Sequence, residues 1–66
     1  MTKQEAIEKM RSGKKVTHQY FSDDEFITIE GDKIVDENGY RLNMIEFWSY
    51  RTSKAFDSDW SIFKSN

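Results

Sequence analysis

The absence of cysteine from a chain of only 66 residues is the feature that most limits how this protein can fold. A chain this short buries a smaller share of its surface than a larger domain does, so its core is marginal. Domains of this size usually gain stability from disulfides, a metal ion or a partner subunit. Disulfides and thiolate metal sites both need cysteine and are excluded. Two alternatives remain: a homo-oligomer, which we favour, and a monomer with a tight aromatic core.

The chain is rich in aromatic residues, with five Phe, three Tyr and two Trp. Such side chains bury large apolar areas, and they are also common at interfaces and at base-stacking surfaces. The net charge of -2 lacks the basic excess that is typical of proteins that bind duplex DNA or RNA. We therefore expect no duplex nucleic acid as a partner, and we expect the rings that the core cannot hide to serve an interface or a ligand.

Residue spacing predicts helices near both ends of the chain. Thr2 and Glu5 have the spacing of a capping box, and Gly13 suits a helix end, so a helix is expected over residues 2–12. A second, short helix is expected over residues 44–51, because Asn43 and Glu46 loosely repeat the capping spacing and apolar residues recur at helical spacing.

Period-two alternation and turn signals predict the strands, which are expected over residues 14–21, 25–30, 33–36, 40–42 and 60–63. Gly31-Asp32 suits a type II′ hairpin turn, and Asn38-Gly39 predicts a second tight turn. The strand at 40–42 is optional, and residues 52–59 are expected to be irregular. The predicted fold is α+β, in the order α-β-β-β-(β)-α-β. It is a single domain over residues 1–66, with a small, mostly antiparallel sheet of four to five strands and helices on one face.

No pattern typical of an enzyme or a metal site is present. His18 is the only imidazole, and the acidic segments Asp23-Asp24-Glu25 and Asp57-Ser58-Asp59 do not match a calcium loop, so we assign them to turns and caps. Gly13-Lys14-Lys15 has only the ending of a phosphate-binding loop and follows a helix. We expect no catalysis, no metal and no cofactor. No apolar run is long enough to span a membrane, and the charged N-terminus does not resemble a signal peptide, so a cytoplasmic location is expected.

The segment 47–54 is the strongest candidate for a binding site, because it combines three rings with two cations. In one interpretation Phe47 and Trp48 are core residues and Arg51 pairs with an acid such as Asp57. In the other, the segment forms part of a nucleotide pocket, because rings can stack on a base and an Arg fork suits phosphate. A helix would place Phe47 with Arg51 on one face and Tyr50 with Lys54 on a neighbouring one. The candidate site residues are then Trp48 and Tyr50 for stacking, Arg51 and Lys54 for phosphate, and His18 and Tyr20 as secondary contacts. Val16, His18 and Tyr20 share a strand face, and periodicity does not decide whether that face is core or pocket.

Both ends of the chain carry short motifs that occur together in a known family. Ala6-Ile7-Glu8-Lys9-Met10 leads into Gly13-Lys14-Lys15-Val16, and the chain closes with Asp59-Trp60-Ser61-Ile62. The pattern is similar to that of the phage anti-Thoeris sponge proteins, over about a third of this chain. That family forms homo-oligomers that sequester cyclic-ADP-ribose-type signalling nucleotides. The central part departs from the family pattern, so no family binding residue is carried over.

The resemblance implies a phage-encoded anti-defence protein in the host cytosol. It would sequester a cyclic or modified nucleotide immune signal at a homo-oligomer interface. The alternative is a phage protein–protein inhibitor of a host nuclease or CRISPR complex, in which an acidic, aromatic-rich surface covers a basic channel. A third interpretation is an assembly subunit of the virion.

Overall fold

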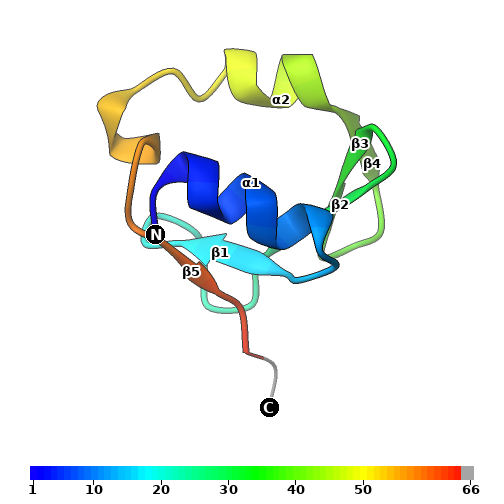
Figure 1. Cartoon of the computed structure of the whole chain (residues 1–66), viewed down its shortest axis with the longest axis horizontal. Helices are drawn as coiled ribbons and strands as arrows, with labels where there is room; N and C mark the ends of the chain where they lie inside the picture. Colours follow the sequence, from blue (N-terminus) through cyan, green and yellow to red (C-terminus); the bar gives the residue numbers. More distant parts are fainter. Residues whose placement is uncertain (65–66) are drawn as a thin grey trace.

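The computed structural model describes residues 1–64, which form a five-stranded antiparallel sheet with two α-helices (Figure 1). The elements in chain order are α1 (Lys3–Arg11), β1 (Val16–His18), β2 (Ile27–Glu30), β3 (Lys33–Asp36), β4 (Arg41–Asn43), α2 (Met44–Ser49), the 3-10 helix η1 (Lys54–Phe56) and β5 (Trp60–Ile62). The strands lie side by side in the order β4-β3-β2-β1-β5, and every neighbouring pair is antiparallel. The predicted α+β class and element order are confirmed, including the optional fourth strand.

Helix α1 begins and ends as the sequence predicts. The Glu5 backbone N–H donates to Thr2 Oγ1 at 3.2 Å, and the Thr2 N–H donates to Glu5 Oε1 at 3.0 Å, which completes the capping box. At the other end Gly13 has a φ of 95°, which lies in the left-handed region that glycine adopts without a side-chain clash. The Gly13 and Lys14 N–H groups donate to the carbonyls of Met10 and Lys9, the pattern of a Schellman motif.

The capping box makes α1 sensitive to acid. Hydrogen bonds from the backbone and the side chain of Thr2 lower the pKa of Glu5 from its ordinary value of 4.5. A carboxylate with a lowered folded-state pKa stabilises the fold above its ordinary pKa, and the contribution is lost as the pH falls through the folded value. We therefore expect Glu5→Gln to lower the melting temperature at about pH 6 and to have a smaller effect at about pH 3. Thermal melts of both proteins at the two pH values measure this, and an equal difference at both would contradict it.

Strand β1 is shorter than the predicted strand over residues 14–21. The chain turns directly after His18, because the Tyr20 N–H donates to the Nδ1 atom of the His18 ring at 3.1 Å. The Phe21 N–H donates to the His18 carbonyl at 2.9 Å and closes the turn. Tyr20 therefore does not continue the strand face that Val16 and His18 share.

The two predicted hairpins are both present. Gly31 has a φ of 61° at the first turn position and is followed by a residue without positive φ, as a type II′ turn requires. The second loop is longer than the predicted tight turn, because Asp36 pairs with Tyr40 across residues 37–39. Asp36 Oδ1 accepts from the N–H groups of Asn38 and Tyr40, and Gly39 takes the left-handed position with a φ of 81°.

One face of the sheet carries the core, and both helices pack on it (Figure 1). Helix α1 contacts β1, β2 and β5, and α2 contacts β3 and β4. The buried cluster consists of Ala6, Met10, Val16, Ile27, Ile29, Ile34, Phe47 and Trp60. The Met1 N atom donates to the Trp60 carbonyl at 2.7 Å and the Trp60 N–H donates to the Met1 carbonyl at 3.1 Å, so Met1 lies along the outer edge of β5. None of the helices within residues 1–64 has the length and apolar character needed to cross a membrane.

Helix α2 ends earlier than predicted. Its last residue is Ser49, whereas the spacing predicts a helix to residue 51. The chain then enters a segment where Ser53 accepts from the Ala55 N–H and starts η1. The predicted irregular segment over residues 52–59 thus contains one short 3-10 turn. Because the helix stops, Tyr50 and Lys54 do not share a helical face.

Candidate functional site

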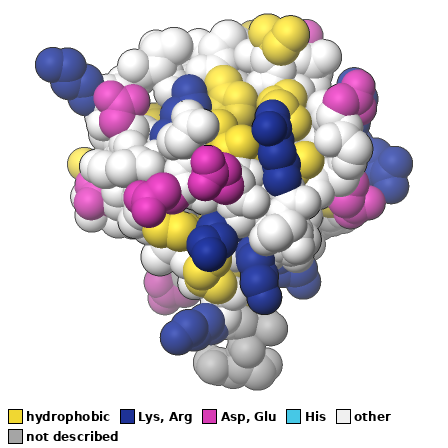
Figure 2. Space-filling model, in the orientation of Figure 1, with side chains coloured by type: hydrophobic (Ala, Val, Ile, Leu, Met, Phe, Trp, Pro, Cys, Tyr) yellow, Lys and Arg dark blue, Asp and Glu magenta, His cyan; other side chains and the backbone are white. Residues whose placement is uncertain are grey.

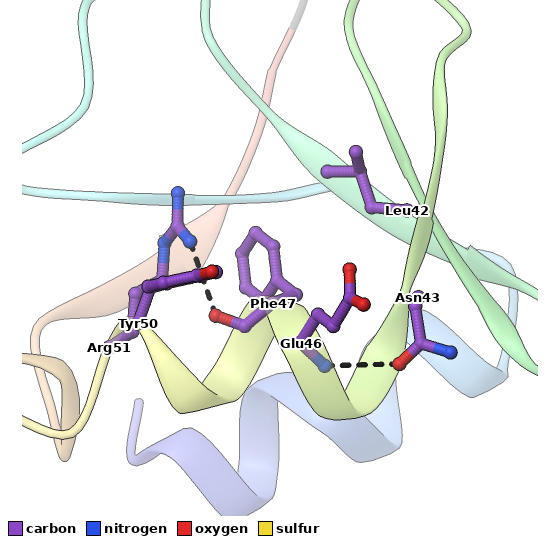
Figure 3. Close-up of a pocket in the computed structure, with 6 residues that line it drawn as sticks. All are labelled: Leu42, Asn43, Glu46, Phe47, Tyr50 and Arg51. Carbon is purple, nitrogen blue, oxygen red and sulfur yellow. Dashed lines mark hydrogen bonds between the residues drawn. The ribbon is translucent and has the colours of Figure 1, made fainter.

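A pocket of about 160 Å³ lies between β4 and α2 (Figure 3). It is lined by Leu42, Asn43, Glu46, Phe47, Tyr50 and Arg51. Figure 3 shows the Phe47 ring in the middle, with Glu46 toward the β4 side and with Tyr50 and Arg51 toward the end of α2. The pocket therefore has an apolar floor with polar groups on two sides.

The junction of β4 with α2 sets the pocket in place. Strand β4 ends at Asn43 and α2 begins at the next residue. Asn43 is the N-cap, because its Oδ1 accepts from the Glu46 N–H at 3.0 Å. No loop separates the two elements, so Leu42 on the strand is held close to Phe47, which is 4% exposed and anchors α2 in the core.

Arg51 is fixed against Phe47 by two contacts. Its guanidinium carbon lies 3.9 Å from the centre of the Phe47 ring, a cation–π arrangement. Its Nη1 donates to the Phe47 carbonyl at 3.2 Å. Since a guanidinium carries five N–H donors, Arg51 keeps donors for a ligand while its plane is held in position. Fixing the side chain in advance reduces the entropy that ligand binding would cost.

The remaining lining groups give the pocket mixed chemistry. The Tyr50 ring is 83% exposed, so one large aromatic surface stands open beside Arg51. The exposed Glu46 carboxylate is an acceptor on the opposite side of Phe47. The pocket thus offers an aromatic surface, a forked donor and a carboxylate acceptor around one buried ring.

Tyr50 and Arg51 are the predicted site residues that line this pocket, and Trp48 and Lys54 lie elsewhere. Trp48 is half-buried and packs edge-on against Phe47 and Trp60, at centroid distances of 4.9 and 5.7 Å. The Nζ atom of Lys3 lies 4.5 Å from the centre of the Trp48 ring. The indole N–H of Trp48 is buried and meets no acceptor among the described residues. Lys54 is exposed on η1 and does not reach the pocket.

His18 lies in the core, which resolves the ambiguity of its strand face. It is 2% exposed, and both ring nitrogens are engaged. Nε2 lies 2.7 Å from the Ala55 carbonyl and 2.9 Å from the Ser58 carbonyl, while Nδ1 accepts from Tyr20. These partners assign the neutral tautomer with the proton on Nε2. Tyr20 is 66% exposed, lies beside His18 and Phe56, and does not line the pocket. The two predicted secondary contacts, His18 and Tyr20, therefore both lie outside the pocket.

The ion pair of Arg51 with an acid such as Asp57, which belongs to one of the two interpretations of the segment 47–54, does not form. Within residues 1–64 the single ion pair joins Arg41 to Glu30 at 3.5 Å on the exposed surface. The same residues contain no group of three His, Asp or Glu side chains placed to hold a metal ion.

Leu42, Asn43, Glu46 and Phe47 also line the pocket and were not predicted as site residues. Asn43 and Glu46 carried a visible signal, their capping spacing, which also places them together at the start of α2. Leu42 carried none, because its position depends on the pairing of β4 with β3. Comparisons with protein-family models, curated proteins and solved structures found no match to this chain.

Proposed function

We propose that this protein is a binding protein that holds a planar ring of a small nucleotide ligand in the pocket between β4 and α2. The observation that carries the proposal is the arrangement of Arg51, which is stacked on the Phe47 ring beside the exposed Tyr50 ring. A base can stack on Tyr50 while the free N–H groups of Arg51 donate to a phosphate. Glu46 accepts from the N–H or hydroxyl groups of the ligand.

A second copy of the chain completes the site in this proposal. Pockets that enclose a small-molecule ligand usually measure about 300–1,000 Å³, and this one measures about 160 Å³. Exposed apolar side chains lie near it, since Ile45 on α2 is 81% exposed and Tyr50, at the end of α2, is 83% exposed. Burying these side chains against a second α2 would enlarge the pocket wall and cover the ligand.

The resemblance of the chain ends to phage sponge proteins supports the identity of the ligand within the same proposal. A sponge needs tight binding and no acid–base machinery, so a preformed pocket with a fixed arginine suits it. The ligand is then a cyclic or modified nucleotide immune signal, and the setting is the cytosol of a phage-infected host.

Tyr50→Ala is the sharpest test, because the exposed ring contributes little to folding. A nucleotide at about 100 times its dissociation constant stabilises a protein by about 2.7 kcal/mol, which raises the melting temperature of so small a domain by roughly 10 °C or more. We expect this shift from one class in a panel of linear and cyclic nucleotides that includes ADP-ribose isomers. Tyr50→Ala should remove the shift and leave the melting temperature of the ligand-free monomer nearly unchanged.

Tyr40→Ala is the matched control, since Tyr40 is 67% exposed and lies outside the pocket lining. It should keep the full thermal shift. Arg51→Gln should also remove the shift, with a small loss of stability because its contacts with Phe47 are lost. A flat response of the native protein across the panel, or an equal shift in Tyr50→Ala, would contradict the proposal.

The exposed side chains Ile45 and Tyr50 favour one alternative, a protein–protein inhibitor. Large exposed apolar and aromatic side chains are typical of an interface. In this case a host nuclease or CRISPR complex would bind the outer side of α2. Ile45→Glu tests this alternative on its own. It should abolish host-protein binding, whether or not a nucleotide shifts the melting temperature.

A further inference from the structure

The helix-free face of the sheet combines rings and cations, although the chain as a whole is slightly acidic. Strand alternation sends the core residues to the helix side and places a second set on the opposite face. This set contains Lys15, Thr17, Phe26, Thr28, Glu30, Lys33, Val35, Arg41, Ser61 and Phe63, as the pairings of Thr17 with Ser61, Thr28 with Val35 and Val35 with Arg41 show. We call this set the open face.

Two phenylalanines form the aromatic part of the open face. The rings of Phe26 and Phe63 are 4.6 Å apart, and both are half-buried. Lys15 Nζ lies 4.8 Å from the centre of the Phe26 ring. The Phe63 N–H donates to the Lys15 carbonyl at 2.9 Å, so sheet pairing fixes all three residues together. None of them belongs to the buried core cluster, and their rings therefore form a separate surface feature.

The charges on the open face are mainly positive. The open face contains three cations, Lys15, Lys33 and Arg41, and one carboxylate, Glu30. Glu30 lies 3.5 Å from Arg41. Figure 2 shows basic side chains gathered in the lower part of the view, near the end of β5 and beside hydrophobic atoms. The open face is therefore basic, although the net charge of the whole chain is -2.

We propose that the open face binds single-stranded nucleic acid without sequence preference. Phe63, backed by Phe26, stacks on a base at the β5 edge, and Lys15 and then Lys33, which follow toward β3 in the sheet order, contact the phosphates along the strand. Proteins that bind single strands use this combination of aromatic stacking and a basic track along the backbone. An acidic peptide would match the cations but would leave the paired rings without a role. The inference is independent of the pocket, which lies on the helix side of the sheet.

The test is fluorescence anisotropy of a labelled oligothymidylate of about 12 nucleotides, a length within the range of single-strand sites. The native protein should bind with a dissociation constant no weaker than about 10⁻⁴ M at low salt. Phe63→Leu should weaken binding by at least about fivefold, since one base–aromatic stack contributes about 1–3 kcal/mol. The variant with both Lys15→Gln and Lys33→Gln should flatten the salt dependence by about 0.7 in slope for each lysine.

Lys9→Gln is the matched control, because it removes an exposed lysine from α1 on the helix side. It should leave the affinity and the salt dependence nearly unchanged, and Tyr50→Ala should bind the oligonucleotide as the native protein does. Circular dichroism checks that each variant folds. If Phe63→Leu fails to fold, the lysine variant decides the question.

Three results would overturn the proposal. One is no binding by the native protein at low salt, and another is equal weakening by Lys9→Gln and by the Lys15 and Lys33 replacements. The last is a dimer in light scattering that Phe63→Leu dissociates, which would identify a second copy of the chain as the occupant of this face.

Discussion

Replacing His18 with leucine is expected to lower the free energy of unfolding by about 3 kcal/mol or more. Leucine fills a similar volume but removes the bonds that His18 makes with the Ala55 and Ser58 carbonyls and with the Tyr20 N–H. A buried polar group left without a partner costs about 1–3 kcal/mol. A domain of this size has a total stability of only about 3–10 kcal/mol, so this loss is a large share of the total.

The loop that His18 holds increases the expected effect. Asp59 has a φ of 70°, in the left-handed region that costs a non-glycine residue energy. The Asp59 carbonyl accepts from the Gln19 N–H at 3.2 Å, and His18 binds the two carbonyls just before this position. Without the imidazole the loop loses the contacts that hold this conformation against β1.

Urea denaturation followed by far-UV circular dichroism measures the change. Tyr20→Phe is the control, because it removes an exposed hydroxyl group and keeps the backbone N–H that His18 accepts. It should stay within about 0.5 kcal/mol of the native protein. If His18→Leu were equally mild, the imidazole would not be holding the loop, and a role for His18 in ligand binding would again be open.

His18 also shows where sequence reasoning reaches its limit. Period-two alternation correctly predicts that His18 shares a face with Val16, because the pattern is local. Its partners Ala55 and Ser58 are 37 and 40 residues away. Only the pairing of β1 with β5 brings them together, and no periodicity encodes that pairing. Tyr20 leaves the strand for a separate reason, the turn in which its N–H donates to His18 Nδ1, whereas the alternation alone extends the strand to residue 21.

The candidate site was predictable where it depends on local geometry. Capping spacing predicts Asn43 and Glu46 at the start of a helix, and helical spacing predicts that Arg51 lies against Phe47. The structure confirms both, although Arg51 lies just past the end of α2. The grouping of Tyr50 with Lys54 was wrong, because it assumed a helix that continues beyond Ser49.

The open face illustrates a different limit. Total charge is a property of the composition, and it predicts no affinity for nucleic acid. The distribution of charge is a property of the fold, because the strands send alternate side chains to opposite faces. Lys15, Lys33 and Arg41 are spread along the sequence and meet on one surface only after β1, β3 and β4 pair within one sheet.

Trp60→Ala is expected to unfold most of the protein, a larger effect than that of His18→Leu. Trp60 is 2% exposed, and its ring lies 4.8 Å from His18, 5.6 Å from Phe21 and 5.7 Å from Trp48. Its Nε1 donates to the Phe56 carbonyl at 2.9 Å. Truncating a buried Trp to Ala costs about 3–5 kcal/mol, which is comparable to the whole stability of a small domain. The variant should lack a cooperative thermal transition in far-UV circular dichroism.

Trp60→Phe is the matched control, because it keeps a ring among these neighbours and removes only the N–H and part of the volume. It should remain folded, with a lower melting temperature than the native protein. A cooperative transition in Trp60→Ala near the native temperature would show that the aromatic cluster is not what stabilises the monomer. The stability would then come from association of copies, and the melting temperature should rise with protein concentration. The melt of Trp60→Ala at two concentrations therefore decides between the two ways in which a short chain without cysteine can be stable, an aromatic core or an oligomer.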